Sequence, residues 1–151
     1  MCAAEYLYNI VQSGYYGIGD WQAWADSVIL NNDTVDSWIY DISLAKSEDE
    51  FRAVVNEQMT VEFEIKDGRL SYDSNIIVGY YYLMYRENRM TRSDLIDILS
   101  DEDSIASDSD IFDIDVSKVN HNELDSLLMP FLKKALEQKR YLESYKLSLK
   151  G

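Results

Sequence analysis

Carboxylates are the side chains most able to do chemistry in this 151-residue chain, and they gather between residues 94 and 125. This stretch holds eleven acids and a single base, Lys118, so it supplies −10 of the formal net charge of −14. Concentrated like charge opposes folding through self-repulsion. A basic partner, bound cations or a need for solubility could explain why the chain carries it. The acids are Asp94, Asp97, Asp101, Glu102, Asp103, Asp108, Asp110, Asp113, Asp115, Glu123 and Asp125.

The densest part of this stretch, residues 101–115, lacks the pattern of a calcium-binding loop. An EF-hand loop needs oxygen ligands at positions 1, 3 and 5, a glycine at position 6 and a glutamate at position 12. A loop that starts at Asp101 places Ile105 at position 5, and one that starts at Asp108 places Phe112 there. Both registers fail, so we expect no dedicated metal site and no cofactor.

Residues that usually carry zinc or nucleophilic chemistry are scarce. His121 is the only histidine and Cys2 the only cysteine, which excludes a histidine cluster for zinc and an intramolecular disulfide. No serine has the flanking glycines of a nucleophile elbow. The glycines at 14, 17 and 19 follow no strand and lack the lysine of a phosphate-binding loop. We therefore expect a non-enzymatic protein, with an enzyme that uses a carboxylate site as an alternative.

The remaining hypothesis is a surface that binds a basic protein. Arrayed carboxylates can imitate the spacing of phosphates and steer a basic partner, and exposed aromatic rings can then anchor it. The competing interpretation is a solvated acidic loop that only keeps the protein soluble. The candidate partner-binding residues are Asp101, Glu102, Asp103, Asp108, Asp110, Asp113, Asp115, Tyr15 and Tyr16.

Charge and hydropathy also predict where the protein acts. A net charge of −14 opposes binding to DNA, RNA or anionic lipid surfaces. No apolar run approaches the roughly 20 residues that span a bilayer. The N-terminal segment MCAAEYLYNIVQ has an acid and no base, unlike the start of a secretory signal. We expect a cytoplasmic protein that binds neither nucleic acid nor membrane.

Hydrophobic periodicity predicts a mainly α protein, and the chain length predicts one compact multi-helix domain over residues 1–151. A segment around 75–89 is apolar on every side, which is typical of a central helix. A buried strand is the alternative, because β-branched and aromatic residues dominate the segment, but its length favours a helix. The expected helices cover residues 3–12, a segment capped by Asp20, a segment capped by Asp33 or Thr34, a segment opened by the capping box Ser47–Glu50, residues 75–89, a short helix capped by Thr91, and residues 122–149 capped by Asn120 or Asn122.

The segment 59–72 admits two interpretations. Apolar and polar residues alternate strictly from Met59 to Lys66, and Asp67-Gly68 can form a tight turn, which favours a β-hairpin. The alternative continues the preceding helix, because Met59 and Phe63 also fit its period.

Two features concern the C-terminal part. Residues 101–120 hold few apolar groups, which predicts an acidic loop before the last helix.

Pro130 lacks an amide donor, so we expect a kink or restart of the last helix near Leu128–Met129. An apolar stripe with a seven-residue repeat follows this helix, and we interpret it as packing within one chain, so a monomer is favoured over a dimer.

Three stretches resemble small helical bacterial proteins of the polymorphic-toxin immunity type: GYYGIGDWQAWADSVIL, WIYDISLAKSEDEF and IIVGYYYLMYRENRMTRSDLIDIL. The resemblance covers roughly residues 10–100 and includes no catalytic motif. It implies a cytoplasmic inhibitor that masks a cognate toxin, often a basic nuclease, by charge and shape. It assigns no interface residue. An acidic nucleic-acid mimic of phage or mobile-element origin is the alternative.

Overall fold

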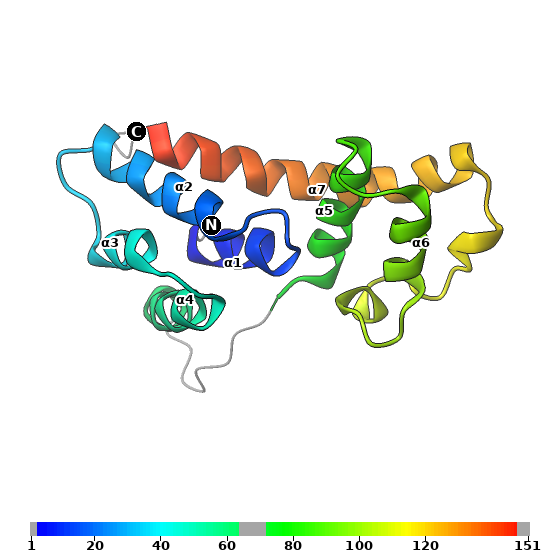
Figure 1. Ribbon diagram of the computed structural model, residues 1–151, viewed down its shortest axis with the longest axis horizontal. Coiled ribbons are helices and arrows are strands. Elements are labelled where there is room, and N and C mark those ends of the chain that lie inside the picture. The colour runs from blue at the N-terminus through cyan, green and yellow to red at the C-terminus, as the bar shows by residue number, and fades with distance from the viewer. Residues whose placement is uncertain (1–2, 64–71, 148–151) are drawn as a thin grey trace. The chain divides into compact units, whose positions relative to one another are not determined.

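The computed structural model describes residues 3–63 and 72–147, and every regular element in these ranges is a helix (Figure 1). This confirms the mainly α fold. The α-helices are α1 (Ala3–Gln12), α2 (Ile18–Asn31), α3 (Ser37–Leu44), α4 (Glu48–Phe63), α5 (Ser74–Arg86), α6 (Arg92–Ser100) and α7 (His121–Leu147), and the short 3-10 helices η1 (Ile105–Asp108) and η2 (Val116–Lys118) lie between α6 and α7.

Residue contacts divide the chain into two compact units. Unit 1 contains Met1–Tyr72 and Gln138–Gly151, and unit 2 contains Asp73–Glu137. Helix α7 therefore contributes its N-terminal part to unit 2 and its C-terminal part to unit 1. The single domain expected from the chain length stays a prediction.

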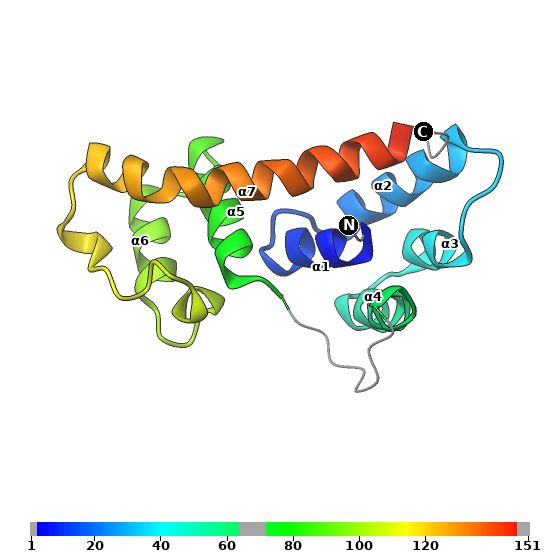
Figure 2. The same ribbon diagram turned by 180° about the vertical axis from the view of Figure 1, so that it is seen from behind.

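Two buried tryptophans of α2 organise unit 1. The ring of Trp21 stacks on Phe51 of α4 with 4.7 Å between ring centroids, and its Nε1 donates to the Ala45 carbonyl at 3.1 Å. Trp24 donates to the Leu142 carbonyl at 2.8 Å, and Figures 1 and 2 show α2 beside this end of α7. Burial of an indole is favourable when its N–H finds a partner. These two bonds therefore join α2 both to the α3–α4 connection and to α7.

Two helix starts differ from the sequence-based expectation. Helix α2 begins one turn earlier than expected, with Gly17 as N-cap, and the Asp20 carboxylate accepts the Gly17 N–H at 2.8 Å. Asp20 thus acts at the third helical position. Helix α3 has Asp36 as N-cap in place of Asp33 or Thr34. Several adjacent residues here have the side-chain preference of an N-cap, so composition alone does not select among them.

Three other helix starts confirm the expected capping. Thr91 Oγ1 accepts the Asp94 N–H at 3.1 Å, and the Asp94 carboxylate accepts the Thr91 N–H at 3.3 Å. Ser47 Oγ accepts the Glu50 N–H at 3.1 Å at the start of α4. Asn120 caps α7 by accepting the N–H of the residue three positions on, at 2.9 Å. Each side chain satisfies a backbone donor that the helix leaves without a partner.

The hairpin predicted for 59–72 is wrong in its first strand, because α4 continues through Phe63. The turn expected at Asp67-Gly68 lies outside the described residues. Helical spacing buries a continuous row of large side chains on α4, and this burial outweighs the alternation that favoured a strand. The buried row is Phe51, Val55 and Met59.

Helix α5 is the central helix of unit 2, as its composition predicts. All residues from Ile76 to Met84 are buried. Helices α5 and α7 approach closely at Gly79, because a Cβ at this position would lie 2.2 Å from the carbonyl oxygen of Phe131 and 2.8 Å from the Cβ of Ala135. Only glycine fits this crossing without displacing a helix.

Helix α7 is a single continuous helix through Pro130, so it does not restart near Leu128–Met129, and the kink expected as the other outcome stays a prediction. Pro130 is exposed and removes only one intrahelical hydrogen bond. Fully buried side chains on both sides of the proline hold the helix in place by packing: Leu124, Leu128, Ala135 and Leu142.

Candidate partner-binding surface

The acidic segment, defined as residues 101–115, belongs to unit 2, and all of its carboxylate residues are exposed. The segment follows α6 and contains η1. The predicted acids at the surface are Asp101, Glu102, Asp103, Asp108, Asp110, Asp113 and Asp115.

Buried apolar residues fix the backbone of the acidic segment. Ala106 in η1, Ile111, and Val116 just beyond the segment are at most 2 % exposed. Helix η1 packs against both α5 and α6. The hydroxyl of Ser109 is also buried and donates to the Ala106 carbonyl at 2.6 Å. Residues 101–120, where we expected an acidic loop, therefore have a backbone that is fixed by packing within unit 2.

Hydrogen bonds to two neighbouring helices add to this anchoring. Asn75 of α5 donates its side-chain amide to Asp110 Oδ2 at 3.0 Å and accepts the Asp110 backbone N–H at 2.9 Å. Ser104 Oγ donates to the Ile98 carbonyl of α6 at 2.7 Å. These bonds hold the segment near its start and at its middle.

Three of the acids have a local structural role. Asp101 accepts the backbone N–H of Asp103 at 2.9 Å, and Asp110 bonds to α5 as described above. Asp115 accepts the backbone N–H of Ser117 at 3.2 Å and lies 3.5 Å from Lys118 Nζ. Hydrogen bonds from Ser117, followed by the Lys118 charge, hold the pKa of the Asp115 carboxyl below its usual value.

Three other acids present carboxylates without a local role. Within residues 3–63 and 72–147, the side chains of Glu102, Asp103 and Asp113 form neither a hydrogen bond nor an ion pair. Asp108 has an electrostatic or hydrogen-bonding contact of its own. The acidic segment therefore carries at least three carboxylates that a partner could engage without disrupting the fold.

The two predicted tyrosines belong to unit 1, which differs from the unit of the acidic segment. Tyr15 is only 9 % exposed, so its expected role as an exposed ring is wrong. Its ring lies 6.1 Å from that of Tyr16, and Lys139 Nζ lies 5.9 Å from its centroid. Tyr16 is half-buried, and burial, followed by the charges of Glu143 and Asp20, raises its pKa to about 12.

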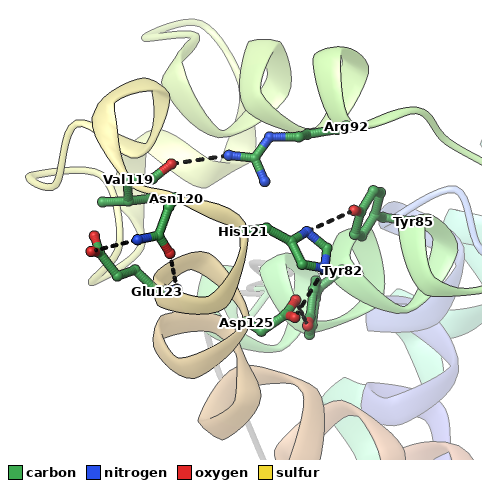
Figure 3. A network of polar contacts seen from close by, with 8 residues as sticks. All are labelled: Tyr82, Tyr85, Arg92, Val119, Asn120, His121, Glu123 and Asp125. Carbon is green, nitrogen blue, oxygen red and sulfur yellow. Dashed lines mark hydrogen bonds and ion pairs between the residues drawn. The ribbon is translucent and has the colours of Figure 1, made fainter.

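A polar network at the start of α7 was not predicted from the sequence (Figure 3). Tyr82 of α5 donates to Asp125 Oδ1, and His121 Nε2 lies 3.3 Å from Asp125 Oδ2. The hydroxyl of Tyr85 lies 3.5 Å from His121 Nδ1. These four side chains line a surface hollow of about 300 Å³ together with Arg86 and Met129.

One part of this network could have been recognised in the sequence. His121 and Asp125 are four residues apart, which places them side by side once the helix is known to begin at His121. The tyrosines come from α5, and no local pattern relates them to α7. The side chain of His121 is 61 % exposed.

We expect the phenol of Tyr82 to titrate near pH 12, because burial and then the hydrogen bond and charge of Asp125 raise its pKa to about 12. An unfolded tyrosine ionises near pH 10, so above pH 10 the unfolded state loses its proton first and stability should fall as the pH rises toward 12. The substitution Asp125→Asn should lower the Tyr82 pKa. Ultraviolet titration of tyrosinate checks this, with Tyr82→Phe as control, and an unchanged high-pH transition in Asp125→Asn would contradict it.

Comparison with protein-family models, curated proteins and solved structures finds no match to this chain. In the part of the chain that the structure describes, no three histidine, cysteine or acidic side chains converge as metal ligands would. The same ranges contain no helix with the length and apolarity needed to cross a bilayer. Function must therefore be inferred from the surface itself.

Proposed function

We propose that this protein is a non-enzymatic binding protein that covers a basic surface of a protein partner with its acidic segment. The observation that carries the proposal is an exposed set of carboxylates on a backbone fixed by Ala106, Ile111 and Val116. A surface ordered before binding loses less conformational entropy when the complex forms. Its charges also steer a basic partner to the surface.

The partner that best fits this chemistry is a cognate toxin with a basic surface. The resemblance to proteins of the polymorphic-toxin immunity type supports this choice, and it implies a complex that forms in the cytoplasm. Masking by charge and shape requires no catalytic group, which suits a surface whose acids are exposed. A nucleic-acid mimic would instead bind several unrelated DNA-binding proteins, so the number of partners recovered from the native host distinguishes the two functions.

The triple substitution Glu102→Gln, Asp103→Asn and Asp113→Asn should weaken partner binding about tenfold at low salt. Each exposed ion pair contributes roughly 0.2–1 kcal/mol, and three together amount to about one decade in affinity. The affinity of the unmodified protein should fall as ionic strength rises, and the triple variant should show a smaller salt dependence. Calorimetric titration of the partner isolated by pull-down from the host measures both quantities.

A matched control removes the same charge from exposed acids outside the acidic segment. The substitutions Asp41→Asn, Glu57→Gln and Glu137→Gln also change the net charge by three, and all three positions are exposed. This control should bind within about twofold of the unmodified protein. Equal losses in the two triple variants would show that only net charge matters, and binding insensitive to salt would overturn the proposed surface.

A further inference from the structure

Three arginines gather around the turn that joins α5 to α6 in unit 2. Asn88 adopts a left-handed backbone with φ of 61°, and the Arg89 N–H donates back to the Met84 carbonyl at 2.8 Å. This turn closes α5 and reverses the chain before Thr91 caps α6. The result is a hollow of about 570 Å³ lined by Tyr85, Arg86, Asn88, Arg89, Met90, Thr91, Arg92 and Asp94.

Two of these guanidinium groups have no carboxylate partner within the described residues. Arg86 lies over the ring of Tyr82, 5.8 Å from its centroid, and Arg92 Nη2 donates to the Val119 carbonyl at 3.0 Å. Neither forms an ion pair in residues 3–63 and 72–147, although the chain has 28 acids for 14 lysines and arginines. Neither guanidinium charge is therefore offset by an ion pair within these residues.

Arg92 adds a second, independent observation. Its other terminal nitrogen, Nη1, is buried and has no hydrogen-bond partner in the described structure. Figure 3 shows this nitrogen turned away from Val119. A buried donor without a partner costs on the order of 1–3 kcal/mol, and more when the group is charged. An anionic acceptor that reached this nitrogen would remove that cost.

The charge balance of the hollow also favours an anion. Asp94 is the one carboxylate residue in its lining, and its Oδ2 accepts the Thr91 N–H at 3.3 Å. Three arginines thus line the hollow with one acidic residue that already caps a helix, although Arg89 has a further contact of its own. The N-terminus of α6 contributes the positive end of a helix dipole at the same place.

We propose that this hollow binds the phosphoryl group of a small molecule, an activity beyond and independent of the partner binding proposed above. Guanidinium forks match phosphate oxygens in geometry and charge. The volume lies within the range of about 300–1,000 Å³ that small-molecule sites occupy. The ring of Tyr85 and the side chain of Met90 supply apolar walls for the organic part of such a ligand.

The test is an amide chemical-shift titration at low ionic strength with inorganic phosphate and, separately, with AMP. We expect saturable shifts at residues 85–94, and at least tenfold weaker binding of both probes in the double variant Arg86→Gln, Arg89→Gln. Arg92 is left unchanged because it also holds Val119. Binding of AMP at least tenfold tighter than phosphate would assign the site to a phosphorylated organic molecule, and equal affinity would assign it to the phosphoryl group alone.

Arg52→Gln provides the matched control, because Arg52 lies on α4 and pairs with Glu48 at 3.2 Å. It should leave both affinities unchanged. The proposal is overturned if neither probe gives a saturable shift, if the double variant binds as tightly as the unmodified protein, or if Arg52→Gln weakens binding equally. A thermal melt of each variant verifies that the compared proteins are folded.

Discussion

Replacing Gly79 with alanine should lower the free energy of unfolding by about 2–3 kcal/mol. The added methyl would sit 2.2 Å from the carbonyl oxygen of Phe131 and 2.8 Å from Ala135 Cβ, so α5 and α7 must move apart within unit 2. Overpacking of this kind costs roughly 1–3 kcal/mol and sometimes more, and here the obstructing atom belongs to a helix backbone that cannot rotate away. The intrinsic helix preference of alanine offsets at most about 1 kcal/mol of the cost.

Gly19→Ala is the matched control for this substitution. Gly19 also lies inside a helix, α2, but a Cβ there meets nothing within 4 Å. The control should therefore stabilise the protein by up to about 1 kcal/mol, since alanine is the better helix former. Urea unfolding monitored by circular dichroism measures both effects. If the two variants had equal stability, the close crossing of α5 and α7 would be refuted.

The sequence was sufficient to predict most helices of this fold, because the signals involved are local. Thr91 and Ser47 cap helices as expected, and the apolar composition of Ile76–Met84 correctly predicted a buried central helix. The close crossing at Gly79 was not predictable, because it depends on Phe131, which is distant in the sequence. Burial on α4 likewise settled a choice between strand and helix that local periodicity left open.

The charge of the candidate surface could be predicted from the sequence, whereas the fixed backbone of the acidic segment could not. Exposure of the carboxylates follows from their composition, whereas anchoring by Ile111 and Val116 depends on a fit to helices elsewhere in the chain. The arginine-lined hollow was missed because Arg86, Arg89 and Arg92 are separated by other residues in the sequence and match no anion-binding motif. Only the left-handed turn between α5 and α6 brings these guanidinium groups around one hollow.

Replacing Ile111 with alanine should separate two contributions of the acidic segment to partner binding: that of its fixed backbone and that of its carboxylate charges. Ile111 is 2 % exposed, and truncation of a buried isoleucine costs about 2–5 kcal/mol because it removes apolar burial and leaves a cavity. The loss should appear mainly as local opening of residues 101–115, with faster amide hydrogen exchange there. Every carboxylate of the segment is retained in this variant.

Ile114→Ala is the matched control within the same segment, since Ile114 is 38 % exposed. Truncation at such a position should change stability by less than about 0.5 kcal/mol. If the ordered backbone matters for partner binding, Ile111→Ala should weaken the affinity several-fold because the segment must then be ordered during association, and Ile114→Ala should leave it within twofold. Equal affinities of the two variants would show that the partner responds to the carboxylates alone, so that anchoring by Ile111 serves stability and does not serve recognition.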